Sequence, residues 1–174
     1  MKSFHQYITE VFDKPYKWSG GSFAKGSITP KNDAKSEPYW FKTSDGGKVE
    51  VIANHFWVGN LDKKLAGIVV KKEGHAIGIE FVKDDRYVLT GEGDAMRILA
   101  TVLDITKAII KKHEPSTIYF SADKSQDKSD RSGREKTGRA KAYAAIVKRF
   151  AGKVGYKSST SEDAGQVRWQ LTKK

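Results

Sequence analysis

The clearest pattern of apolar and polar residues lies between Asp94 and His113 and predicts an amphipathic α-helix. Apolar side chains recur there at spacings of three and four residues, with charged or polar side chains between them. Asp94 stands at the position of an N-cap, while Lys111, Lys112 and His113 suit the negative end of the helix dipole. The pattern therefore predicts a helix that begins at Asp94 and ends before Pro115.

Short runs rich in β-branched and aromatic residues precede this helix and predict antiparallel strands. Residues 39–43 and 48–54 flank a Gly-Gly turn and predict a hairpin. Residues 67–70, 77–81 and 86–89 continue as a meander with one buried face.

A strand, a helix and a further strand are expected after the first helix. Residues 116–122 form an uncharged run typical of an interior strand, and the polar residues 123–138 follow as a long loop. A second amphipathic helix is expected from about Arg139 to Gly152, and residues 166–171 alternate as a last strand. The predicted class is α+β, an antiparallel meander followed by strand-helix-strand-helix-strand.

The N-terminal segment is expected to be an extension of one α+β domain that spans residues 39–174. Residues 1–14 have the spacing of a short amphipathic helix, and residues 13–38 are rich in Gly, Ser, Lys and Pro. Residues 1–38 are therefore predicted to be a helix and an extended loop packed on the core, with Tyr16, Trp18 and Phe23 as anchors.

Composition narrows the chemistry that the chain can perform. The sequence of 174 residues has no cysteine, which excludes a disulfide scaffold, a Cys-ligated zinc site and a thiol nucleophile. Its longest stretch without Asp, Glu, Lys or Arg, residues 51–61, is far shorter than the roughly 20 apolar residues of a membrane-spanning helix. The N-terminus lacks the apolar segment of a secretory signal. We therefore expect an intracellular protein.

The net charge of +11 is concentrated in one part of the chain. Residues 124–149 contain nine basic and three acidic residues and so contribute +6 of that charge. A loop of this kind could bind the phosphates of DNA or RNA, or it could bind an acidic host protein. The alternative is a solvated loop without a partner. The candidate nucleic-acid contacts are Lys124, Lys128, Arg131, Arg134, Lys136 and Arg149.

A Gly-x-Gly turn joins the meander to the first helix. Gly91 and Gly93 come directly before Asp94 and Ala95, so unpaired backbone N–H groups are expected at the positive end of the helix dipole. Such an end can bind a phosphate, although glycine also serves a tight turn for steric reasons alone.

From about residue 48 onward, the succession of elements resembles the GNAT superfamily of N-acetyltransferases. In that family a strand opens into a pyrophosphate-binding loop and helix, a further strand follows, and a helix carrying a tyrosine precedes a Gly-Phe strand entry. Here Tyr143 stands at the place of that tyrosine and Gly155-Tyr156 at the place of Gly-Phe.

The resemblance implies acetyl-CoA as cofactor. It assigns Tyr143 as the general acid for the departing thiolate, the backbone from Gly91 through Gly93 to Ala95 as the pyrophosphate site, and Arg139 as a phosphate contact. Val88 stands where the family has a basic residue, and acidic residues flank the turn, which favours a non-catalytic protein on the same scaffold.

Few other side chains suggest chemistry. Glu80 lies opposite the apolar positions of its strand and is a candidate general base, or simply faces solvent. The four histidines, His5, His55, His75 and His113, are scattered singly without the spacing of a metal motif, so no metal site is predicted.

Two functions remain open from the sequence. One is transfer of an acetyl group from acetyl-CoA to an amine, and the alternative is a basic binding protein that meets nucleic acid or an acidic host protein. The N-terminal sequence, residues 90–95 and residues 139–143 also resemble small bacteriophage proteins, which implies expression in the cytoplasm of a bacterial host or packaging in a virion.

Overall fold

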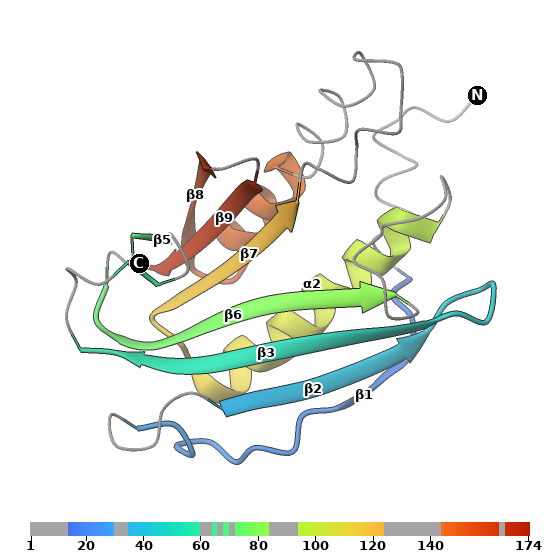
Figure 1. Ribbon diagram of the computed structural model, residues 1–174, viewed down its shortest axis with the longest axis horizontal. Coiled ribbons are helices and arrows are strands. Elements are labelled where there is room, and N and C mark those ends of the chain that lie inside the picture. Colours follow the sequence, from blue (N-terminus) through green and yellow to red (C-terminus); the bar gives the residue numbers. More distant parts are fainter. Residues whose placement is uncertain are drawn as a thin grey trace.

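The computed structural model has a mixed α+β fold built on a seven-stranded sheet (Figure 1). It describes residues 14–29, 35–59, 64–65, 68–69, 72–83, 94–123, 144–163 and 166–174. The elements of the sheet are β1 (Trp18–Gly20), β2 (Lys35–Lys42), β3 (Lys48–Val58), β6 (Gly74–Lys83), β7 (Thr117–Asp123), β8 (Tyr156–Asp163) and β9 (Gln166–Lys173). The helices are α2 (Asp94–His113) and residues 144–153.

The sheet has the order β1-β2-β3-β6-β7-β9-β8. Within it β6 and β7 form the one parallel pair of the described strands, and the remaining neighbours are antiparallel. A parallel pair needs a crossover connection, and here α2 lies in the connection between β6 and β7. The α+β class expected from the sequence is therefore confirmed.

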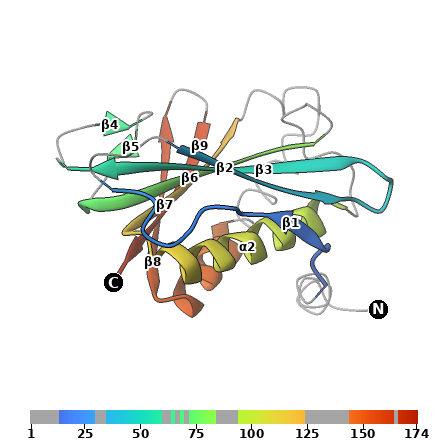
Figure 2. The same cartoon turned by 90° about the horizontal axis from the view of Figure 1, so that it is seen from below.

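Both helices pack on the same face of the sheet and share one core. Figure 2 shows α2 running beneath the strands. Alternate residues of the central strands point to α2 because side chains along a strand alternate between its two faces. Fully buried members of this core include Val49, Val51, Ile77, Ile79 and Ile118 from the sheet and Ile98, Ile105 and Ile109 from α2. Ile146, Val147 and Ala151 join the same core from the helix of residues 144–153.

The first described residues are fixed to the domain by aromatic side chains, as expected. The Tyr16 ring stacks on Phe41 with centroids 5.6 Å apart, and the Tyr16 backbone N–H donates to Thr101 Oγ1 at 2.9 Å. Trp18 Nε1 donates to Asp104 Oδ2 at 2.9 Å. These contacts join Tyr16 to β2 and α2, and Trp18 of β1 to α2.

Several expected elements are present, the helix at its expected start and the strands with bounds that differ by one to four residues. The predicted helix coincides with α2, and the predicted hairpin is the β2–β3 pair, closed by a hydrogen bond from Thr43 N–H to the Gly47 carbonyl at 2.9 Å. Gly46 adopts a φ of 82° in this turn, which glycine tolerates without steric cost. The expected strands after α2 are β7 and β9.

Other expectations were wrong or incomplete. The segment 13–38 contains β1 and the start of β2 where only loop was expected, because pairing with β2 overrides the poor strand propensity of Trp18–Gly20. Of the expected strand 67–70, the described residues form β5 (Ile68–Val69), which pairs with β4 (Lys64–Leu65) in a separate two-stranded sheet and not with the main sheet. The residue pattern did not predict the polar strand β8, and only the resemblance, through Gly155-Tyr156, implied a strand entry there. Residues 1–13 and 86–89, the loop 124–138 and the start of the second helix lie outside the described residues.

Within the described part of the chain, no helix has the length and apolar character needed to cross a membrane.

Candidate functional site

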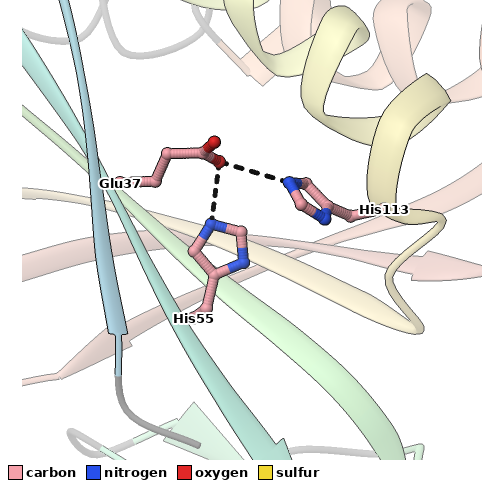
Figure 3. Close-up of side chains that lie close together, drawn as sticks. All are labelled: Glu37, His55 and His113. Atoms are coloured by element: carbon pink, nitrogen blue, oxygen red, sulfur yellow. Dashed lines mark hydrogen bonds and ion pairs between the residues drawn. The ribbon is translucent and has the colours of Figure 1, made fainter. Parts of the chain in front are cut away.

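Three of the four histidines meet a glutamate under the sheet, at the C-terminal end of α2. Glu37 comes from β2, His55 from β3, His75 from the start of β6, and His113 is the last residue of α2. Figure 3 shows Glu37, His55 and His113 pointing toward one another. Glu37 is 0% exposed, His55 1% and His113 9%. We call these four side chains the histidine–glutamate cluster.

One oxygen of Glu37 is held by two donors. Glu37 Oε1 accepts a hydrogen bond from the Phe23 backbone N–H at 2.8 Å and another from Lys112 Nζ at 3.0 Å. The Lys112 side chain is 30% exposed, so its charge is partly screened by water. These two contacts fix the orientation of the carboxylate.

The other oxygen faces the histidines. Glu37 Oε2 accepts a hydrogen bond from the Tyr39 hydroxyl at 2.9 Å, and it lies 3.2 Å from His55 Nε2 and 3.2 Å from His113 Nε2. Burial and the neighbouring Glu37 raise the pKa of Tyr39 far above its ordinary value, so this hydroxyl stays a donor. Burial by itself raises the pKa of Glu37, but the hydrogen bonds to the carboxylate outweigh it and hold that pKa far below its ordinary value. Glu37 is therefore a buried anion.

His75 supports His55 from the side away from Glu37. His55 Nδ1 lies 2.9 Å from His75 Nε2, and the two rings stack with centroids 5.1 Å apart. Burial, together with the nearby His55 and His113, lowers the pKa of His75 to about 4. At neutral pH His75 is thus a neutral imidazole that can accept a hydrogen bond from His55.

A cavity adjoins the cluster. It has a volume of about 390 Å³, and its walls include His75, His113 and Trp57. Glu114 and Lys173 also line it, with side chains that are 53% and 44% exposed, so the cavity reaches the protein surface. A small ligand or ion entering the cavity would meet the imidazoles of His75 and His113.

A second distinctive place lies where β6 and β7 separate. Their parallel register runs from Ala76 paired with Thr117 to Ile79 paired with Phe120. Beyond this point β6 pairs only with β3, and β7 only with β9, among the described strands. Figure 1 shows the two arrows diverging toward their carboxyl ends, with the N-terminal end of α2 on the same side.

Two polar side chains mark this opening on the sheet face away from α2. Glu80, the first residue of β6 after the paired stretch, is exposed. Tyr119 of β7 packs over Gly78 and against Phe56, with the two aromatic centroids 5.7 Å apart. Burial and the negative charge of Glu80 raise the pKa of Tyr119, so its hydroxyl stays protonated at neutral pH.

The structure places few of the residues that the sequence singled out. Glu80 lies at the strand opening, Ala95 is in the first turn of α2, and Arg149 is an exposed residue of the helix at 144–153. The others lie outside the described residues, namely Tyr143, Gly91, Gly93, Arg139, Lys124, Lys128, Arg131, Arg134 and Lys136.

The histidine–glutamate cluster was missed because its members are far apart in the sequence. Within any single element the histidines are isolated, so no local spacing forms a metal or acid–base motif. A signal did exist in the strand pattern: His55 continues the buried alternation of Val49, Val51 and Ala53, and Glu37 precedes the buried Tyr39 by two residues. Polar residues at inward positions are unusual enough to mark a site.

No family model, curated protein or solved structure matches this chain.

Proposed function

We propose that this protein has an N-acetyltransferase-like arrangement and transfers an acetyl group from acetyl-CoA, bound between β6 and β7, to an amine. The observation that carries the proposal is the divergence of β6 and β7, the one parallel pair among the described strands, beyond Ile79 and Phe120 (Figure 1). The crossover through α2 between these strands agrees with the element order on which the sequence resemblance rests.

At the opening, β6 and β7 have backbone edges that no other described strand occupies. One edge of each strand pairs with a neighbour, since β3 pairs with Glu80–Lys83 of β6 and β9 pairs with Ser121–Asp123 of β7. The opposite edges of these two segments face each other, and no described strand lies between them. Backbone N–H and C=O groups need partners, and an extended chain containing amides can supply them as an added strand does. The pantetheine arm of coenzyme A is such a chain.

The N-terminal end of α2 suits the phosphates of the same cofactor. The helix begins at Asp94 on the side toward which β6 and β7 open (Figure 1). Backbone N–H groups and the helix dipole favour a phosphate at this end, although the Asp94 carboxylate opposes it. The phosphate contacts expected at Gly91, Gly93 and Arg139 remain part of the proposal.

In this proposal Glu80 is the general base. Its carboxylate would accept the proton that the amine loses as the amine nitrogen attacks the thioester carbonyl carbon. The carbon–sulfur bond then breaks, and the departing thiolate takes a proton from an acid. The resemblance assigns this acid role to Tyr143, and the protonated Tyr119 hydroxyl lies beside the same opening.

Calorimetry and a thiol-release assay test the proposal. We expect acetyl-CoA to bind and raise the melting temperature, because a ligand at 100 times its dissociation constant stabilises the folded state by about 2.7 kcal/mol. With a panel of primary amines, Glu80→Gln should lower kcat about 100-fold or more while leaving acetyl-CoA affinity unchanged, since a general base contributes roughly 10²–10⁴-fold.

A matched control removes an acidic side chain at the other end of the same strand. Glu73→Gln changes an exposed carboxylate directly before β6, at the end of that strand away from the opening, and should leave the rate unchanged. Absence of acetyl-CoA binding overturns the proposal. Binding of a short DNA duplex in its place, lost when Arg131, Arg134 and Arg139 become Ala, would assign the protein to the basic binding class.

A further inference from the structure

We propose that Glu37, His55 and His113 bind a divalent transition-metal ion of the zinc class, with His75 holding His55 in the binding orientation. This site is independent of the proposed acetyl transfer. It lies at the C-terminal end of α2, whereas the strand opening faces the N-terminal end of that helix.

The three donor atoms converge at a spacing that suits a single ion. Glu37 Oε2 is 3.2 Å from His55 Nε2 and 3.2 Å from His113 Nε2, and the three ligand atoms all lie within 4.8 Å of one another. In a tetrahedral zinc site with bonds of about 2.0–2.1 Å, neighbouring donor atoms are about 3.3 Å apart. Two of the three donor spacings therefore match those of an occupied site, and the third, between the two imidazole nitrogens, is at most 4.8 Å.

The crowding at Glu37 Oε2 also favours a cation. A carboxylate oxygen offers about two lone-pair directions, but Oε2 faces the Tyr39 hydroxyl and two imidazole nitrogens. One metal bond together with the hydrogen bond from Tyr39 would use both directions. The two imidazole nitrogens would then bind the ion through their own lone pairs instead of competing for the same oxygen.

The surrounding contacts resemble those that orient metal ligands. A histidine that binds a metal through one ring nitrogen usually donates its other N–H to a neighbouring acceptor, which fixes the ring and its tautomer. His55 has Nε2 toward Glu37 and Nδ1 2.9 Å from His75 Nε2. The Phe23 N–H and Lys112 hold the far oxygen of Glu37 and so aim Oε2 at the histidines.

The cavity beside the cluster adjoins the donor set. His113 belongs both to the donor set and to the wall of the cavity of about 390 Å³. Three protein ligands leave a fourth position of a tetrahedral zinc-class ion to water or to a small ligand. A donor set of imidazole and carboxylate suits zinc, cobalt or nickel better than calcium or magnesium, which prefer oxygen ligands throughout.

Cobalt binding to the chelator-stripped full-length protein tests the site. Tetrahedral Co²⁺ has visible absorption bands that are far stronger than those of the hydrated ion. We expect a saturable spectrum with one equivalent of Co²⁺, its displacement by Zn²⁺, and a rise in melting temperature with either ion. A protein that gives no such spectrum and no thermal shift with Co²⁺ or Zn²⁺ overturns the proposal, and the cluster is then a hydrogen-bonded part of the core.

Variants locate the ion. Glu37→Gln keeps the shape of the side chain but removes the anionic ligand and should weaken Co²⁺ binding at least 100-fold. His75→Gln leaves all three ligands in place and should weaken binding about 10–100-fold, as removal of an orienting partner does. The His75→Gln variant tests the metal site even if Glu37→Gln fails to fold.

The fourth histidine provides the control. His5→Gln removes the one histidine outside the cluster and should leave the Co²⁺ affinity and spectrum unchanged. Binding that is lost in His5→Gln, or that is undiminished in both Glu37→Gln and His75→Gln, places the ion elsewhere and overturns the assignment.

Discussion

Replacement of Glu37 tests how strongly one buried carboxylate stabilises the fold. In Glu37→Gln the amide oxygen can still accept from Lys112 and the Phe23 N–H, while the amide NH₂ must face Tyr39 and the histidines. The Tyr39 hydroxyl can turn and the histidines can change tautomer, so that they accept hydrogen bonds from the amide. The loss in free energy of unfolding is therefore less than the roughly 3–5 kcal/mol typical of breaking a buried ion pair. We expect about 2–4 kcal/mol.

Glu37→Ala is the matched comparison. It removes every acceptor and leaves a cavity, so it should cost more than Glu37→Gln, by roughly 1–2 kcal/mol. Urea unfolding in the presence of a chelator, followed by far-UV circular dichroism, gives both values from the change in midpoint at constant slope. A loss below about 0.5 kcal/mol for Glu37→Gln would refute the reasoning, because it lies within the range of ordinary surface substitutions.

The pH dependence of this difference adds a second check. The folded-state pKa of Glu37 is depressed, so its contribution to stability is present above the ordinary value of 4.5 and is lost as the pH falls below it. The stability gap between wild type and Glu37→Gln should therefore narrow on acidification. A gap that stays constant between pH 6 and pH 3 would show that the carboxylate charge is not the source of the effect.

Two further predictions concern His75 and the strand opening. The pKa of His75 is lowered from 6.5 to about 4 in the folded protein, so the unfolded chain binds the proton more readily. The free energy of unfolding should therefore decrease as the pH is lowered from 6.5 to about 4. This loss of stability is on the order of 2 kcal/mol, allowing for partial exposure of the ring. In His75→Gln the free energy of unfolding, measured by urea unfolding at each pH, should depend less on pH above about pH 5. A Cβ on Gly78 would lie 2.4 Å from the Tyr119 ring, so Gly78→Ala should cost about 1–3 kcal/mol. Adding Tyr119→Ala should remove most of that extra cost in a double-mutant cycle, and strictly additive losses would contradict the contact.

Periodicity predicted the elements that bury one regular face. Helix α2 was predicted at its observed bounds because its apolar residues follow the helical repeat and both of its ends carry terminal signals. The β2–β3 hairpin was predicted for similar reasons, since its turn and alternation are local features. Such elements are specified by residues that are close together in the sequence.

Elements that depend on their neighbours could not be predicted in this way. Strand β8 is polar after its first residue, the buried Tyr156, and lies at the edge of the sheet, where it pairs with β9 alone. The short β1 likewise forms because Trp18 and Gly20 pair with Phe41 and Tyr39. Neither has the apolar alternation from which strands are predicted.

The candidate site was only partly visible in the sequence. Glu80 was singled out from the alternation of its strand, and it lies beside the opening between β6 and β7. The histidine–glutamate cluster required the register of three strands and the end of α2, which bring Glu37 and His113 together across 76 positions of the chain. Such long-range pairing follows from the topology and not from any local spacing.

Amide hydrogen exchange with and without acetyl-CoA tests most directly whether the cofactor lies between β6 and β7. We predict slower exchange at Glu80–Lys83 and Ser121–Asp123, where the diverging strands leave backbone groups facing each other, and in the first turn of α2. The strand pair β8–β9, on the far side of β7, should be unchanged. Acetyl-CoA binding that leaves exchange at both strand segments unaltered would contradict the account.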